Sequence, residues 1–327
     1  MKAKNTAFRS FSESYNLEVI GLVIVAEPGS WLRRNTTSCV RSILWWPAFF
    51  IHTLRSELGD FMNIKQYYHA TASVYLNISL FAVGLSIALF TVNLFLFQKE
   101  GIWYTAIPFM VFSCIYFIYH LVYKKRYESM PEEISLSGAG PLKEDYVMLA
   151  FMPAPTLRVL LFNQKGEVLG EINDCLASWY SWLIPSSLLS LVPYSYKLTD
   201  ANNRTLATFK MNRLFSRDMT FYNERNEIIG SYREDWKRSL VRYKGVVHYG
   251  GVDRMHVDVS GFLQSFTISS CEGEWLVSYD KGWMPLEWTE VFKELNTPIL
   301  HFTGAATEED RICIYGLCAR LFSNSKN

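Results

Sequence analysis

The pattern of apolar and polar positions is dominated by two long apolar runs, 72–97 and 102–123. Only residues 98–101 separate them, and neither run contains Asp, Glu, Lys or Arg. About 20 apolar helical residues span the ~30 Å hydrocarbon core of a bilayer. The polar residues of the first run are scattered, whereas an amphipathic helix of a soluble protein would place them on one face. We therefore expect a transmembrane helical hairpin within 62–126, in preference to a buried helix pair.

The charges that flank the two runs predict their orientation. Lys65 precedes the first run, Lys124, Lys125 and Arg126 follow the second, and the turn between the runs carries one Lys and one Glu. Because Lys and Arg collect on the cytoplasmic side, we expect a multi-pass cell-membrane protein with both termini in the cytoplasm. Aromatic residues near the ends of the runs fit interfacial belts: Tyr67, Tyr68, Tyr75, Trp103, Tyr104, Tyr116, Tyr119 and Tyr123.

The first 61 residues are poorly defined. Their apolar stretches, 17–26 and 43–54, are too short to span a bilayer. One interpretation is an interfacial amphipathic segment. The other is that Met62 is the natural start and that 1–61 is not native, because residues 57–61 can be encoded by codons that resemble a bacterial ribosome-binding site. Both interpretations stay open.

The second half of the chain has a different pattern. Residues 127–146 are rich in Pro, Gly, Ser and charges, which is typical of a linker. Within 147–327, four blocks each combine an alternating strand, a polar turn and a second alternating strand, which predicts β-hairpins. These blocks are VLLFNQKGEVLGEI (159–172), YKLTDANNRTLATF (196–209), MTFYNERNEIIGSY (219–232) and FTISSCEGEWLVSY (266–279).

Further strands are expected at 242–249 and 255–259. The repeated hairpins favour an all-β antiparallel meander that closes into a barrel, since closure removes exposed strand edges. A β-sandwich is the alternative. At the C-terminal end, Thr307 and the acidic residues 308–310 predict a helix start. Residues 312–319 are apolar on all sides, so this helix should be buried or inserted in a membrane, and it could fill the barrel core.

The hairpins YKLTDANNRTLATF and MTFYNERNEIIGSY, closed by DRICIYGLCARLF, resemble the tubby C-terminal-like superfamily, which includes tubby proteins, phospholipid scramblases and LURP-one-related proteins. The resemblance covers 157–322, about half of the chain. It implies a twelve-stranded antiparallel barrel around a central hydrophobic C-terminal helix. The chain departs from scramblases in placing its apolar spans before the barrel and in lacking an EF-hand loop and a palmitoylation-type Cys cluster.

Composition and motifs argue against an enzyme. The net charge of +1 gives no global footprint for nucleic acid. The six Cys form no CxxC pair and have no zinc spacing, which favours free thiols in a reducing compartment. No GxSxG, HExxH, P-loop or Rossmann motif occurs, so we expect no cofactor and no metal. His256 and Asp258 alternate onto one strand face near Asp253, and we interpret them as surface polar residues in preference to an acid–base pair.

Two groups of residues are candidates for contact with a membrane surface. The first group is basic and would contact anionic headgroups, the alternative being a solvated charged face: Arg204, Lys210, Arg213, Arg217, Lys237, Arg238, Arg242 and Lys244. The second group is aromatic and apolar and would insert into the interface, the alternative being a connection that covers the core: Trp179, Tyr180, Trp182 and Leu183.

These observations predict a non-catalytic, membrane-anchored module that binds anionic lipid headgroups or a protein partner at the cytoplasmic face. A scramblase-like lipid transporter is one alternative, because polar residues in the first span can line a pathway or pack helices: Asn77, Ser79, Ser86, Thr91 and Asn93. An immunity or partner-binding membrane protein is another.

Overall fold

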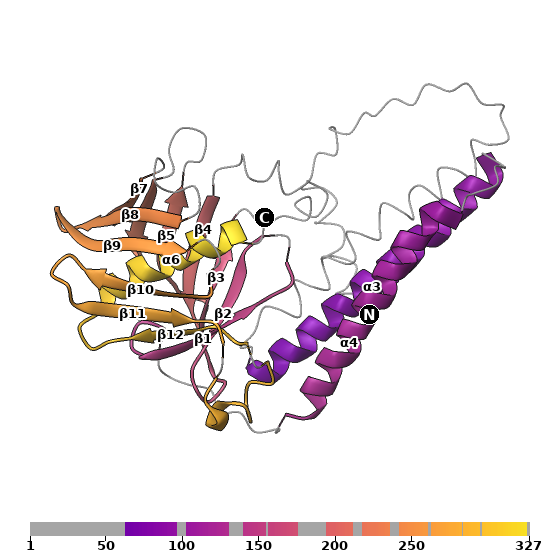
Figure 1. Cartoon of the computed structure of the whole chain (residues 1–327), viewed down its shortest axis with the longest axis horizontal. Coiled ribbons are helices and arrows are strands. Elements are labelled where there is room, and N and C mark those ends of the chain that lie inside the picture. The colour runs from indigo at the N-terminus through magenta and orange to yellow at the C-terminus, as the bar shows by residue number, and fades with distance from the viewer. Residues whose placement is uncertain are drawn as a thin grey trace, which may run out of the picture. The chain divides into compact units, whose positions relative to one another are not determined.

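The chain forms a helical hairpin followed by an antiparallel β-barrel with a C-terminal helix (Figure 1). The computed structural model describes residues 63–96, 103–130, 140–154, 156–175, 194–211, 218–235, 242–260, 263–282, 284–294 and 296–325. The predicted segment 1–61 lies outside the described residues, as do residues 131–139 of the predicted linker.

The hairpin consists of α3 (Ile64–Leu96) and α4 (Trp103–Glu128). Both are long and apolar enough to cross a membrane. α3 begins well before the apolar run that predicts it, because Asn63 caps it: the Gln66 backbone N–H donates to Asn63 Oδ1 and the Asn63 backbone N–H donates to Gln66 Oε1, both at 2.9 Å. α4 continues into the expected linker as far as Glu128.

Polar side chains inside the hairpin join its two helices. The hydroxyls of Ser79 and Ser113 each lie 3.0 Å from the backbone oxygen of the other residue. Nearer the barrel, Tyr75 packs against the rings of Tyr116, Tyr119 and Tyr123, with ring centroids 5.3 to 6.1 Å apart. The helices are therefore held together by small hydroxyl residues at one level and by aromatic packing at another.

Twelve strands form the barrel, and each pairs antiparallel with its neighbours in the sequence. The barrel closes because β1 also pairs with β12, with Tyr146 opposite His301. The expected meander is therefore observed. Its strands are β1 (Tyr146–Phe151), β2 (Arg158–Phe162), β3 (Val168–Asp174), β4 (Tyr194–Asp200), β5 (Thr205–Met211), β6 (Met219–Asn223), β7 (Ile228–Glu234), β8 (Arg242–Tyr249), β9 (Val252–Ser260), β10 (Ser265–Ser270), β11 (Trp275–Asp280) and β12 (Ile299–Phe302).

All four predicted hairpins are confirmed, and they share one turn design. The first turn residue accepts backbone N–H donors with its side-chain oxygen, as Asn223 does from Arg225 and Glu227, both at 2.9 Å. The fourth turn residue has a positive φ, which Gly and Asn tolerate best. These residues are Gly166, Asn203, Asn226 and Gly273, with φ of 76°, 64°, 61° and 89°. Each hairpin also carries a register shift beside its turn.

Strands β1 and β12 were not anticipated from residue pattern. β12 has only 4 residues. β1 has four consecutive buried residues at its centre, so it shows no alternation of apolar and polar positions. Apolar and polar residues alternate in a strand with one solvent-exposed face, whereas a strand that is covered on both faces lacks this alternation.

The two faces of β1 and β2 join two separate apolar clusters. Val147, Leu149 and Leu161 point into the barrel and belong to its interior cluster. The alternate residues point outward and join an outer cluster with the start of α3. This outer cluster contains Met148, Leu160, Phe162, Ile64, Tyr67, Tyr68 and Phe292 among others.

The barrel interior is occupied by α6 (Glu308–Ser325), whose residues join the interior cluster. Its predicted start is confirmed by a reciprocal cap: the Asp310 backbone N–H donates to Thr307 Oγ1 at 3.2 Å, and the Thr307 backbone N–H donates to Asp310 Oδ2 at 3.1 Å. The helix also buries charges that the apolar pattern did not suggest, including Asp310, Arg311 and Arg320.

Candidate functional site

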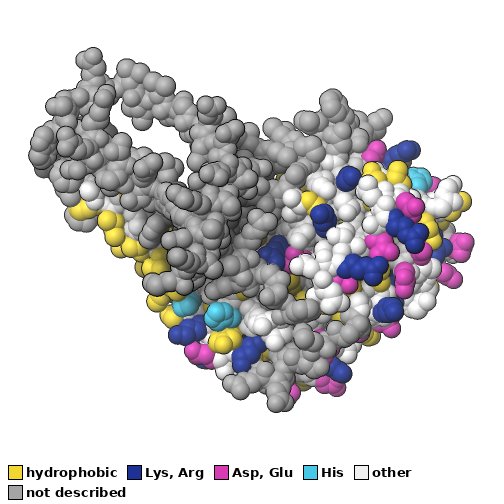
Figure 2. Space-filling view, turned by 180° about the vertical axis from the view of Figure 1, so that it is seen from behind, with side chains coloured by type: hydrophobic (Ala, Val, Ile, Leu, Met, Phe, Trp, Pro, Cys, Tyr) yellow, Lys and Arg dark blue, Asp and Glu magenta, His cyan; other side chains and the backbone are white. Residues whose placement is uncertain are grey.

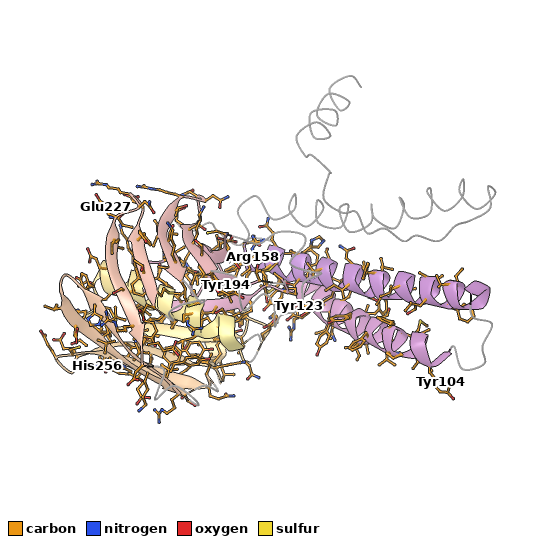
Figure 3. All side chains as sticks on the ribbon, turned by 90° about the horizontal axis from the view of Figure 1, so that it is seen from above. Tyr104, Tyr123, Arg158, Tyr194, Glu227 and His256 are labelled. Atoms are coloured by element: carbon orange, nitrogen blue, oxygen red, sulfur yellow. The ribbon has the colours of Figure 1, made fainter. Side chains whose placement is uncertain are left out.

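The ends of the twelve antiparallel strands form two rims, one at each end of the barrel. One rim is formed by the ends of strands at Phe151, Arg158, Asp174, Tyr194, Met211, Met219, Glu234, Arg242, Ser260, Ser265, Asp280 and Ile299. We name it the hairpin-side rim. The opposite strand ends, with the four shared turns, form the far rim. Figure 3 shows Arg158 and Tyr194 on the side of the barrel toward the hairpin, and Glu227 at the other end.

The start of α3 runs along the outside of the barrel from the far rim to the hairpin-side rim. The Ile64 backbone N–H donates to the Gly166 carbonyl, 3.1 Å away, in a far-rim turn. Two turns later, Thr71 contacts Met152, which follows the end of β1 at the hairpin-side rim. The helix then continues beyond the barrel. The hairpin therefore extends from the side that carries the hairpin-side rim.

Polar contacts fix this attachment. Lys293 donates its backbone N–H to Tyr68 Oη at 2.9 Å, and Tyr67 Oη donates to the Phe151 carbonyl at 3.4 Å. From α4, Arg126 Nη1 donates to Glu294 Oε1 at 2.9 Å, and both side chains are largely shielded from solvent. Both helices of the hairpin are thus bonded to the barrel, and their apolar contacts with it form the outer cluster.

The structure separates the candidate basic residues. Lys210, Arg242 and Lys244 lie at or beside the hairpin-side rim, whereas Arg204 lies in the β4–β5 turn at the far rim. Arg204 and Lys210 are close together in the sequence, but β5 separates them, so they lie at opposite ends of the barrel. Candidates outside the described residues are Arg213, Arg217, Lys237, Arg238, Trp179, Tyr180, Trp182 and Leu183. The strand ends that flank their segments all belong to the hairpin-side rim.

Most of the described basic candidates form ion pairs with carboxylates. Asp258 lies 2.8 Å from Arg242 Nε and 3.2 Å from Lys244 Nζ. Desolvation acts to raise the pKa of Asp258, but the hydrogen bonds and charges of these two cations outweigh it and hold the pKa below its ordinary value. Arg204 pairs with Glu224.

Lys210 is different, because no carboxylate in the described part of the chain pairs with it. Its Nζ lies 4.6 Å from the centroid of the Tyr222 ring, in a cation–π contact. Over the face drawn in Figure 2, Lys and Arg side chains are interspersed with Asp and Glu, so that face shows no patch of a single sign.

The acid–base alternative receives no support from the geometry. Asp258 bonds to Arg242 and Lys244, and Asp253 bonds to His248 on the neighbouring strand. His256 is exposed on the outer face of β9. Among the described residues, no group of three or more His, Cys, Asp or Glu side chains is arranged to hold a metal ion.

A buried polar group inside the barrel was missed by sequence reasoning. Arg320 on α6 donates from Nη2 to Glu234 Oε2 at 2.9 Å, and the two side chains are 5% and 1% exposed. Its Nε and Nη1 atoms have no hydrogen-bond partner among the described residues. A charge inside an apolar helix signals a buried partner, but the sequence does not say which of the many carboxylates pairs with it.

The buried thiols of α6 are chemically inert. Burial, with smaller contributions from the nearby Asp310 and Glu309 charges, raises the pKa of Cys313 to about 12. Burial likewise holds the pKa of Cys318 far above its ordinary value. Neither thiol is paired in a disulfide, and the same holds for the exposed Cys175 and Cys271. A thiol with a raised pKa carries little thiolate, so these residues are structural in character.

Comparison with known proteins gave no relatives: no family model, no curated protein and no solved structure matches this chain.

Proposed function

We propose that the chain is a non-catalytic, membrane-anchored module whose barrel binds anionic lipid headgroups through the hairpin-side rim. One observation carries this proposal. The start of α3 lies along β1 and β2, and the helix leaves the barrel on the side of that rim. Because the membrane anchor holds this rim near the membrane surface, the effective concentration of headgroups at the rim is high.

The anchor itself is part of the proposal. α3 and α4 cross the membrane as a hairpin, with both termini in the cytoplasm, because 124–126 carry three positive charges at the barrel end of α4. The ring cluster of Tyr75, Tyr116, Tyr119 and Tyr123 then lies near the cytoplasmic interface, where aromatic residues with a polar tip are favoured.

Weak contacts are sufficient for such a tethered site. Each basic residue near an anionic leaflet contributes about 1 kcal/mol. Lys210 is available without breaking an ion pair to a described carboxylate. The bonds from Arg242 and Lys244 to Asp258 are solvent-exposed, with side chains 54% and 36% accessible, and exposed pairs are easily exchanged for a lipid phosphate.

Membership of the tubby C-terminal-like superfamily is likewise a proposal. It is supported by the closed twelve-strand meander and by a C-terminal helix packed in the barrel interior. A lipid-transport function has less support, because the buried hydroxyls of Ser79 and Ser113 are used in helix packing and Ser86 donates to the Ala82 carbonyl of its own helix. Binding of a protein partner is the outcome to expect if the lipid experiment fails.

The test uses the full chain in nanodiscs of phosphatidylcholine, with and without phosphatidylglycerol. The rate of amine labelling is measured by mass spectrometry at Lys210 and Lys244. We expect slower labelling at both in anionic nanodiscs, and recovery at high salt, because salt screens headgroup contacts. Lys165 is the matched control, since it is exposed in a far-rim turn. The proposal would be overturned if the labelling rates of Lys210 and Lys244 changed no more than that of Lys165 between the two kinds of nanodisc.

A further inference from the structure

A groove on the outer wall of the barrel reaches the hairpin-side rim at Ser265, Asp280 and Ile299, on other strands than those that carry Lys210 and Lys244. It has a volume of about 520 Å³ and lies between the outer faces of β10, β11 and β12 and the segment that carries the 3₁₀ helix η2 (Leu286–Trp288). This volume falls in the range of small-molecule sites, about 300–1,000 Å³. Its lining is a mixture of aromatic rings, hydroxyls and charges.

Aromatic rings line one side of the groove. Tyr146 and His301 face each other across the β1–β12 pair, and their rings stack with centroids 4.3 Å apart and planes 3° apart. Trp288 lies against Tyr146 at 5.6 Å with an interplanar angle of 66°. Two aromatic planes thus meet at a steep angle. Ring faces in such a corner attract organic cations through their quadrupoles.

The carboxylate of Asp280 also lines the groove. Asp280 is flanked on the outer face by Ile299 of β12 and Ser265 of β10. No Lys or Arg within the described ranges pairs with Asp280, whereas Glu171 and Glu294 each hold an arginine. A carboxylate beside aromatic faces is complementary to an ammonium group. Lys281, also in the lining, adds a positive charge next to Asp280.

We propose that this groove binds a small zwitterion that joins an organic ammonium group to an oxyanion, as phosphocholine and phosphoethanolamine do. The ammonium lies between Asp280 and the Tyr146–Trp288 corner, and the oxyanion pairs with Lys281. This site is independent of the headgroup contacts proposed for Lys210 and Lys244. The zwitterion comes either from a lipid headgroup or from a free molecule.

The experiment titrates the full chain, in maltoside detergent, with phosphocholine, choline and inorganic phosphate, following intrinsic fluorescence and thermal stability. We expect saturable binding of phosphocholine, weaker binding of choline and none of phosphate. Trp288→Leu should weaken choline binding by about fivefold or more, the loss of one cation–π contact. Asp280→Asn should weaken it as well. Lys281→Met should abolish the preference for phosphocholine over choline.

Trp275→Leu is the matched control. Trp275 is on β11 and contacts the ring of His301 at 6.4 Å, but it does not line the groove. Absence of saturable binding, or equal weakening by Trp288→Leu and Trp275→Leu, would overturn the proposal. Two further arms distinguish the source. Loss of phosphocholine binding in phosphatidylcholine nanodiscs, with retention in phosphatidylglycerol nanodiscs, indicates a lipid source, and retention in both indicates a free molecule. Neither result depends on the salt-sensitive labelling of Lys210.

Discussion

Arg320 is held inside the barrel by a single described ion pair, to Glu234. Tyr232, two residues earlier on β7, is buried beside this pair, and its ring passes over Gly245, where a Cβ atom would come within 2.4 Å of it. Burial and the nearby Glu234 charge raise the pKa of Tyr232 well above its ordinary value, so the phenol stays neutral. A buried ion pair of this kind adds little net stability, because the desolvation of its two charges offsets their attraction, but removal of one partner leaves the other charge buried alone.

Replacement of Arg320 by Met should destabilise the barrel by about 3–5 kcal/mol, because it leaves the Glu234 carboxylate buried without its arginine. Addition of Glu234→Gln should recover most of that loss. Chemical unfolding of the full chain, followed by circular dichroism, measures both. The exposed pair Arg242–Asp258 provides the control, and its double replacement should cost no more than about 1 kcal/mol. Equal losses in the single and double Arg320 variants would contradict this account.

At the scale of elements, the four shared turns have the same local design but different surroundings. Asn226 and Asn203 occupy the positive-φ position in turns that project from the barrel. Gly273 occupies the same position, and a Cβ added there would face open space, with no atom within 4 Å. Gly166 occupies it where α3 begins, and a Cβ there would lie 2.5 Å from Val291 Cγ1 and 2.6 Å from Ile64 Cγ2.

Replacement of Gly166 by Asn should therefore destabilise the protein by crowding Val291 and Ile64. The backbone conformation should persist, because Asn tolerates a positive φ. Gly273→Asn should leave the free energy of unfolding unchanged within about 0.5 kcal/mol, as is usual for surface changes. Gly166→Asn should cost about 1–3 kcal/mol, the range for overpacking, and should loosen the start of α3. Hydrogen exchange at Ile64 and Tyr68, compared between the two variants, measures that loosening. Identical exchange in both variants would show that Gly166 serves the turn alone.

At the scale of the whole molecule, the barrel and the hairpin share a core. The outward residues of β1 and β2 are as buried as the inward ones, because α3 and the segment that contains Phe292 cover them. A barrel cut away from the hairpin would expose this surface. Contiguous apolar surface of that kind drives association or aggregation.

A fragment of residues 140–327 should therefore aggregate or bind a hydrophobic dye. The triple replacement of Met148, Leu160 and Phe162 by Thr should improve its solubility, because these side chains point out of the barrel. Replacement of Leu149 and Leu161 by Thr is the control and should unfold the fragment, since both point inward. Size-exclusion chromatography separates the outcomes. A monodisperse unmodified fragment would contradict the shared-core interpretation.

Local pattern alone determined much of this fold. The two apolar helices, the four hairpins and the capped C-terminal helix each depend on residues close together in the chain: an apolar run, a turn with Asn or Gly at a positive φ, and Thr307 with Asp310. Such short-range interactions can be recognised in a sequence because the hydrophobic period and the turn residues act within a few positions of one another.

Tertiary structure decided the rest. β1 lacks alternation because both of its faces are covered, the outer one by α3 and the segment that contains Phe292. Arg204 and Lys210 are six positions apart in sequence, yet one strand carries them to opposite rims. The Arg320–Glu234 pair and the Tyr146–Trp288 corner join residues far apart in the chain. The Tyr146–Trp288 corner depends on closure of the barrel, which brings β1 beside β12, and the Arg320–Glu234 pair depends on the packing of α6 in the barrel interior. No local pattern encodes a partner across such a distance in sequence.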